Sequence, residues 1–165
     1  MHPRIDNPAG AVPGALEALQ ALGTAVRKSG FPKTTLYLVE LRASQINGCS
    51  ICVDIHSHEL KLAGEPAERI NGVAAWRETP YFTEAERAAL ALTEAATRLA
   101  DRPDPVPDDV WDEAAHHYDN AHLATLVIAI ATINAFNRIN ASTRQVTGEW
   151  VRQWVEHTQH AEQAA

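Results

Sequence analysis

The residues with the clearest chemistry lie in the stretch SQINGCSICVDIHSHEL, residues 44–60. It holds both cysteines of the chain, Cys49 and Cys52, in a CxxC pattern, and His56 follows one helical turn later. On a helix, two thiols three residues apart share a face, and a residue four positions further lies beside the second thiol. Such a group forms a redox dithiol with its own base, part of a metal site, or a pair of inert thiols.

The break before the cysteines predicts where their helix begins. Asn47-Gly48 ends the preceding helical pattern, so the next helix is expected to begin between Gly48 and Ser50. Cys49 then lies at a helix N-terminus, where the macrodipole and unpaired N–H groups stabilise a thiolate. The imidazole of His56 titrates near neutral pH and can reach the thiol of Cys52. The helix dipole thus favours Cys49 as the thiolate, whereas the histidine favours Cys52.

Three hypotheses for this group remain open at this point. In the redox hypothesis, a thiolate attacks a peroxide, becomes a sulfenic acid and condenses with its neighbour to a disulfide, which requires sulfurs that face each other and that solvent can reach. A zinc site needs a fourth ligand beside Cys49, Cys52 and His56, and on a helix His58 points about 160° away from His56. Inert buried thiols are the third hypothesis. Covalent haem is not indicated, because Val53 stands where its histidine would be.

A carboxylate and a phenol precede the cysteines on the helix before the break. Glu40 lies nine residues before Cys49, and Tyr37 lies one turn before Glu40 on a similar face. Two helices joined at Asn47-Gly48 can bring that face over the thiols, where a carboxylate would orient His56 as the third group of a triad orients its base. The alternative for Glu40 is a surface ion pair with a nearby lysine or arginine.

The elements that must position these residues are predicted to be helices. Apolar residues recur at helical intervals almost throughout the chain, and we find no alternating run typical of a strand. Thr83 and Glu86 form a capping box at the start of one helix. We therefore expect an all-α fold, one domain over residues 1–165 with its core at about 30–145. About seven or eight helices are predicted, near residues 13–30, 32–47, 48–64, 66–76, 83–99, 110–119, 122–140 and 148–161.

The last two of these helices have distinct patterns. Residues 122–140 are apolar on almost every side and are placed at the centre of the bundle, with Asn134 and Asn137 on one side of the helix. Buried amides need partners, so these two are expected to hold a neighbouring loop or a subunit interface, and a direct role in the site is the third alternative. The terminal helix either docks on another subunit or folds back on its own domain. On one face it is expected to carry Trp150, Val151, Trp154 and Val155.

Composition excludes several function classes. The chain has 165 residues and a formal net charge of −7, so a nucleic-acid partner is not expected. We find no apolar run of bilayer-spanning length and no signal pattern in MHPRIDNPAG, and we therefore expect a cytoplasmic protein without membrane association. A permanent disulfide is rare in that compartment, which favours a reactive or metal-bound cysteine pair.

The segment LRASQINGCSICVDIHSHELKLAGE, residues 41–65, resembles the AhpD-like alkylhydroperoxidases of the carboxymuconolactone decarboxylase family, in its single-domain branch. Residues 74–99 and 126–140 extend the resemblance, which covers about residues 30–145. It implies a homo-oligomer, a trimer or hexamer, with the site near subunit contacts. It also implies an antioxidant peroxidase that reduces hydroperoxides through the CxxC pair. A dithiol donor of lipoyl or thioredoxin type would regenerate the pair, with no cofactor or metal.

The resemblance also assigns roles to residues. It makes Cys52 the peroxide-attacking cysteine, Cys49 the resolving one and His56 the proton relay. The relay glutamate of the family would stand twelve residues before Cys49, where this chain has Tyr37; Glu40 is expected to serve instead, with Tyr37 as a hydrogen-bond donor. Family members without the cysteine pair decarboxylate a lactone, which is not expected here. The rival to an enzyme is a thiol redox sensor or binding protein on the same scaffold.

Overall fold

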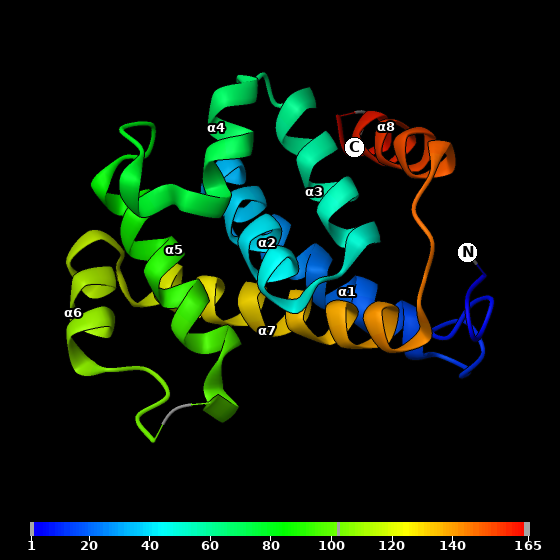
Figure 1. Cartoon of the computed structure of the whole chain (residues 1–165), viewed down its shortest axis with the longest axis horizontal. Helices are drawn as coiled ribbons and strands as arrows, with labels where there is room; N and C mark the ends of the chain where they lie inside the picture. The colour runs from blue at the N-terminus through cyan, green and yellow to red at the C-terminus, as the bar shows by residue number, and fades with distance from the viewer. Residues whose placement is uncertain (1, 102, 164–165) are drawn as a thin grey trace.

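The computed structural model describes residues 2–101 and 103–163, and in these residues every regular element is helical. The all-α prediction is therefore confirmed (Figure 1). Two short 3-10 segments, Val73–Glu78 and Leu99–Asp101, accompany eight α-helices. The helices are α1 (Ala15–Arg27), α2 (Lys33–Asn47), α3 (Ser50–Leu62), α4 (Ala67–Gly72), α5 (Glu84–Thr97), α6 (Asp108–His117), α7 (Asn120–Thr143) and α8 (Glu149–Gln163).

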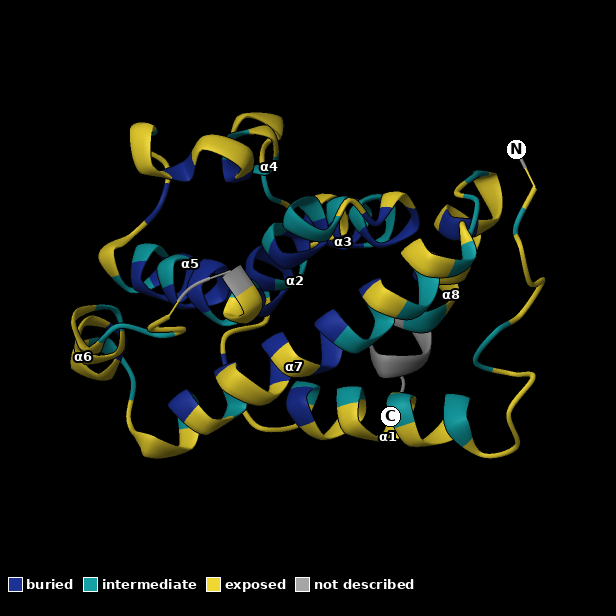
Figure 2. Cartoon of the chain, turned by 60° about the horizontal axis from the view of Figure 1, so that its bottom comes forward, coloured by how far each residue is buried: buried dark blue, intermediate teal, exposed yellow. Residues whose placement is uncertain are grey.

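Helix α2 is the central helix of the bundle. It packs against α3, α5 and α7, and its buried face carries Leu36, Val39 and Leu41, the core residues expected from the sequence. The long α7 runs along one side of the bundle beside α1, with α5 and α6 at one end and α3 and α8 at the other (Figures 1 and 2). The site residues on α2 and α3 are therefore fixed relative to each other by the packing of these two helices.

The turn between α2 and α3 is held by a left-handed glycine and by amides of α7. Gly48 has φ 65°, a conformation that a residue with a side chain adopts at a cost, and it ends α2. The Asn47 side chain donates from Nδ2 to Oδ1 of Asn134 and to Oδ1 of Asn137, each at 2.9 Å. Among the expected roles of these buried asparagines, the structure shows the one in which they hold a neighbouring loop.

Helix α7 is longer and more apolar than the sequence analysis allowed. By length and composition, its 24 residues could cross a bilayer, so the expectation that no run approaches that length is wrong. The structure packs this helix against α1, α2 and α5, and its asparagine side chains bond into the bundle. Figure 2 shows buried residues along its inner face. The helix nevertheless lies along one side of the bundle, with Val127 and Ile128 exposed, so the expectation that it forms the centre of the bundle is wrong.

Helix α8 folds back onto α3 of the same chain. Val151 and Val155 are buried and pack against the cluster around the cysteines, whereas Trp150 and Trp154 are 50% and 44% exposed. At about 100° per residue the four side chains lie within an arc of about 140°, as predicted, but the two valines face the core and the two tryptophans lie at the exposed edge of that arc. The fold-back alternative is therefore the one observed, and docking of α8 on another subunit stays a prediction.

Packing of α3 on α2 can be tested with two leucines of α3. Leu60 is fully buried in a cluster with Tyr37 and Leu41 of α2, whereas Leu62 is 44% exposed. We expect Leu60→Ala to lower the free energy of unfolding by about 2–5 kcal/mol through lost burial and a residual cavity. The control Leu62→Ala should change it by about 0.5 kcal/mol or less. Urea denaturation measures both, and equal effects would contradict the described packing.

Candidate functional site

The cysteine pair lies at the N-terminus of α3, as the sequence predicted. Cys49 is the residue before the first helical residue, Ser50, and has an extended backbone, with no side chain capping the helix. Cys49 and Cys52 form a disulfide with their Cα atoms 5.4 Å apart, inside the ordinary disulfide range of roughly 4.4–6.8 Å. The two sulfurs therefore face each other, as the redox hypothesis requires.

The disulfide is buried, but a hollow reaches one of its two residues. Cys49 is 1% and Cys52 2% exposed, and both belong to an apolar cluster with residues of α7 and α8. A hollow of about 520 Å³ lies between the start of α3 and the segment that follows α7. Its lining includes Gly48, Cys49, Ser50, Asn140, Arg144 and Thr147. Solvent thus approaches the pair from the side of Cys49.

His56 is buried and faces two carboxylates with one ring nitrogen. Its Nδ1 lies 2.7 Å from Oε2 of Glu59 and 3.4 Å from Oε2 of Glu40. The side chains of Glu59 and Glu40 are only 6% and 12% exposed. The structure thus brings Glu40 to His56, as the sequence predicted, and Glu40 is largely buried rather than at the surface.

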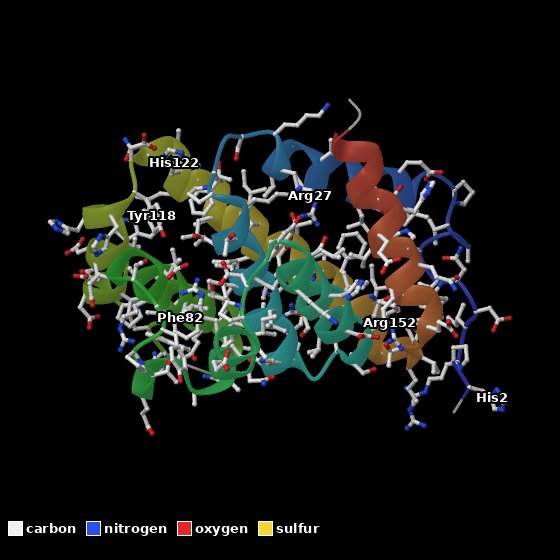
Figure 3. All side chains as sticks on the ribbon, turned by 90° about the horizontal axis from the view of Figure 1, so that it is seen from above. His2, Arg27, Phe82, Tyr118, His122 and Arg152 are labelled. Atoms are coloured by element: carbon white, nitrogen blue, oxygen red, sulfur yellow. A yellow bond between two sulfur atoms is a disulfide. The ribbon has the colours of Figure 1, made fainter. Side chains whose placement is uncertain are left out.

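Glu59 and Arg27 complete this network, and the sequence analysis assigned a role to neither. Glu59 lies three residues after His56 on the same helix, so the i,i+3 spacing was a usable signal. Arg27 comes from the last turn of α1, and its guanidinium Nη2 lies 3.3 Å from Oε1 of Glu59 and 3.9 Å from Oε2 of Glu40. Figure 3 shows the Arg27 side chain extending from α1 into the bundle. Only the packing of α1 in the bundle could reveal this contact.

The charges around His56 favour its protonated form. Burial by itself lowers the pKa of His56, but the charge of Glu40 and the hydrogen bond and charge of Glu59 raise it more, and Arg27 lowers it only in part. The pKa of His56 is therefore above its ordinary value of about 6.5. Burial raises the pKa of Glu59, yet the contact with His56 and the charge of Arg27 hold it below its usual value. Both shifts favour an imidazolium beside a carboxylate.

Tyr37, which stands where the family's relay glutamate would be, is buried beside the network. Its ring faces the guanidinium of Arg27, 5.4 Å from the ring centroid, and Nζ of Lys33 lies 5.9 Å from the same centroid. The ring thus contacts two cations by their attraction to its π face. Its expected role as a hydrogen-bond donor in the site stays a prediction.

The zinc hypothesis does not match this arrangement. A disulfide offers no thiolate ligand, and Nδ1 of His56 faces the carboxylates of Glu40 and Glu59. One ligand atom of each of these three residues lies within 4.8 Å of the others, which is close enough for a cation. The guanidinium of Arg27 and the protonated imidazole already supply positive charge to both carboxylates.

The source of the raised His56 pKa can be tested by removing each carboxylate charge. We expect Glu40→Gln and Glu59→Gln each to lower the pKa of His56, because each removes a negative charge that favours the imidazolium. The measurement is an NMR titration of the His56 ring. Glu156→Gln is the control, since Glu156 is half exposed and contacts His58 instead. An unchanged His56 pKa in both test variants would contradict the network.

The same network predicts a pH window of stability. Because the pKa of His56 is raised in the folded protein, its protonation stabilises the fold. This stabilisation is complete below the pKa of His56 in the unfolded chain, about 6.5, and is lost as the pH rises through its pKa in the folded protein. Because the pKa of Glu59 is lowered in the folded protein, its ionised form also stabilises the fold. This stabilisation is complete above the pKa of Glu59 in the unfolded chain, about 4.3, and is lost as the pH falls through its pKa in the folded protein. Urea unfolding between pH 4 and 9 should show the largest excess stability of the native protein over His56→Gln between about 4.3 and 6.5. A difference independent of pH would contradict the ion pair.

Two proteins of similar sequence are both described as uncharacterized. The uncharacterized protein YdfG of Bacillus subtilis (strain 168) is 33% identical over 128 residues, which are 78% of this chain and 86% of that protein. The uncharacterized protein YnjA of Escherichia coli (strain K12) is 33% identical over 105 residues, 64% of this chain and 56% of its own length. These two relatives show sequence similarity, but their names state no function.

Solved structures share the fold. A protein of unknown function from Agrobacterium tumefaciens, for which a role as the antioxidant defence protein AhpD has been suggested, is 37% identical with a TM-score of 0.84, over 89% of this chain and 99% of its own. The debrominase Bmp8 has a TM-score of 0.76 at 21% identity, over 90% of this chain and 78% of its own. A cysteine-to-alanine variant of Bmp8 is known in complex with 2,3,4-tribromopyrrole. At this identity the likeness to Bmp8 shows the fold alone.

The predicted resemblance is confirmed by a family model as well as by these structures. Residues 13–95 match the model of the carboxymuconolactone decarboxylase family, and this range contains the disulfide, His56 and both of its carboxylates. With its all-helical, AhpD-like fold, the chain belongs to the carboxymuconolactone decarboxylase family.

Proposed function

We propose that this protein is a thiol-dependent peroxidase that reduces hydroperoxides through a Cys49–Cys52 dithiol/disulfide cycle and acts in antioxidant defence. One observation carries the proposal: a disulfide at the N-terminus of α3 shares that helix with a buried, carboxylate-bound His56 one turn beyond Cys52. Family membership and the antioxidant role suggested for the Agrobacterium protein support it.

In the first step, the thiolate of Cys52 attacks the terminal oxygen of the hydroperoxide. An S–O bond forms, the O–O bond breaks, and the departing alkoxide takes a proton to become the alcohol, while Cys52 is oxidised by two electrons to a sulfenic acid. A nearby acid accelerates this step by protonating the leaving oxygen. His56 is suited to be that acid, because its surroundings raise its pKa and so favour its protonated form.

In the second step, the thiol of Cys49 attacks the sulfur of the Cys52 sulfenic acid. The S–S bond forms as the S–O bond breaks, and the departing hydroxide leaves as water with the thiol proton. The product is the disulfide seen in the structure. A dithiol reductant of lipoyl or thioredoxin type then returns two electrons and restores both thiols.

Glu59 and Glu40 act in this proposal as positioning residues for His56. Their contacts fall on Nδ1, so Nε2 is the ring nitrogen that remains to exchange protons with the reacting groups. The distances rank the two carboxylates, with Glu59 at 2.7 Å as the direct hydrogen-bond partner and Glu40 at 3.4 Å as the second charge. The relay carboxylate missing at the position of Tyr37 is thus supplied from two other positions.

The proposal also covers the cellular compartment, the oligomeric state and the partners of the protein. We place it in the cytoplasm as a homo-oligomer, a trimer or hexamer, with no nucleic-acid or membrane partner. Its formal net charge of −7 opposes nucleic acid, and the inner face of α7 packs against α1, α2 and α5. The exposed Trp150 and Trp154 of α8 are compatible with a subunit contact on that face.

Peroxide turnover tests the enzyme against its rival, a thiol sensor. We expect the reduced protein to consume hydrogen peroxide and cumene hydroperoxide catalytically with dihydrolipoamide, and Cys52→Ser to consume neither. Cys49→Ser should consume one equivalent without added reductant, since its sulfenic acid has no partner. His56→Gln should slow turnover by about 100-fold or more, the effect typical of losing a general acid.

Two outcomes would contradict this assignment. If Cys52→Ser consumes peroxide as fast as the native protein, Cys52 is not the attacking residue. If one equivalent of peroxide oxidises the native protein but no dithiol sustains turnover, the protein is a sensor and not a peroxidase.

A further inference from the structure

Beyond the peroxide step, we propose that Asn140 is a catalytic residue for reduction of the disulfide. Its side-chain amide stabilises the thiolate of Cys52 that leaves when a small dithiol attacks Cys49 from the hollow. This inference rests on the proposed redox cycle of the cysteine pair, and it concerns the reductive half of that cycle.

The contact that carries this inference joins α7 to α3. Nδ2 of Asn140, near the end of α7, donates a hydrogen bond to Sγ of Cys52 at 3.5 Å. In the disulfide this sulfur is neutral, and the hydrogen bond is weak. When the S–S bond breaks, negative charge develops on that sulfur, and a hydrogen bond from a fixed amide to an ionised acceptor becomes much stronger. Asn140 is therefore placed to act where charge appears in the reaction.

The hollow indicates which sulfur the reductant attacks. Cys49 and Asn140 both belong to its lining and Cys52 does not, although both cysteines are almost fully buried, at 1% and 2% exposure. Its volume of about 520 Å³ is within the range of roughly 300–1,000 Å³ for small-molecule sites. A dithiol that enters meets Cys49 first, so Cys52 becomes the leaving group. Asn140 both borders the entry route and contacts the leaving sulfur.

The reaction balances as two successive thiol–disulfide exchanges. A thiolate of the dithiol attacks Sγ of Cys49, a mixed disulfide forms, and the Cys49–Cys52 bond breaks with its electron pair on Cys52. The second thiolate of the reductant then attacks its own bound sulfur and releases the thiolate of Cys49. The reductant becomes a cyclic disulfide, and two electrons pass to the protein. A lower pKa of the leaving thiol accelerates the first exchange, which is the effect expected of the Asn140 amide.

Two substitutions of Asn140 isolate the amide donor. Asn140→Leu keeps a similar volume without a donor, and Asn140→Asp replaces the donor by a negative charge. The control is Ser142→Ala, two residues further on, exposed and outside the lining of this hollow. We expect the oxidised Asn140→Leu protein to be reduced by dithiothreitol or dihydrolipoamide about tenfold more slowly than the native protein, as for loss of a hydrogen bond to a charged group. Asn140→Asp should be slower still, and Ser142→Ala unchanged.

A second readout separates this role from a merely structural one. In a Cys49→Ser background, the rate of Cys52 alkylation by iodoacetamide against pH gives the pKa of the Cys52 thiol. This pKa should rise with Asn140→Leu and rise further with Asn140→Asp, while Ser142→Ala leaves it in place. The other ionisable groups near the pair and the hollow, including His56, Asp54, Arg144 and His2, are the same in every variant.

A trapping experiment on the native protein tests the direction of attack. Oxidised protein is mixed with excess glutathione, quenched with acid, and the mixed disulfide is located by tandem mass spectrometry. Glutathione on Cys49 supports the inference, and glutathione on Cys52 overturns it, as does an Asn140→Leu variant with native reduction rate and native Cys52 pKa. These measurements use no peroxide, so a protein without peroxidase activity can still pass them, and an active peroxidase can fail them.

Discussion

The buried ion pair between His56 and Glu59 is the interaction on which the arrangement of the site depends. Burying a charge is unfavourable unless another charge and hydrogen bonds compensate it. Here the imidazolium has two carboxylates as neighbours, and the guanidinium of Arg27 approaches both, so two cations face two anions. The four groups come from α1, α2 and α3. The site can therefore form only when these three helices are packed together, which couples its chemistry to the fold.

A single helix also connects the proton chemistry to the sulfur chemistry. Helix α3 carries the disulfide at its first turn and His56 one turn further, so the backbone hydrogen bonds of the helix fix their separation. At the start of α3, Gly48 and the side chain of Asn47 anchor the turn to α7. Valines of α8 cover the pair from the other side. The cysteines thus lie in a rigid frame with access through the hollow beside Cys49.

The sequence predicted those features whose cause is local along the chain. The start of α3, the glycine before it and the capping box of Thr83 depend on neighbouring residues, and all three were predicted correctly. Contact between Glu40 and His56 followed from joining two helices at one turn. Arg27 was missed because nothing short of the tertiary packing of α1 places it there. The packing of α8 was left open because its pattern contains apolar residues in adjacent pairs, which cannot show which member of each pair faces the core.

The proposed cycle explains why two arguments from sequence favoured different cysteines. One argument rested on the position of Cys49 at the N-terminus of α3. Cys49 also lines the hollow, so in the proposed cycle its sulfur is the one that a bulky thiol approaches. The other argument rested on His56, which follows Cys52 by one helical turn. In the proposed cycle Cys52 is the residue that is oxidised, and its oxidation needs a proton donor for the leaving alkoxide. Asn140 adds a donor to the same sulfur, so Cys52 is the residue whose negative charge the surroundings stabilise in both half-reactions. In the proposed cycle the two sulfurs are therefore unequal: one exchanges with the reductant, and the other meets the peroxide and leaves as a thiolate.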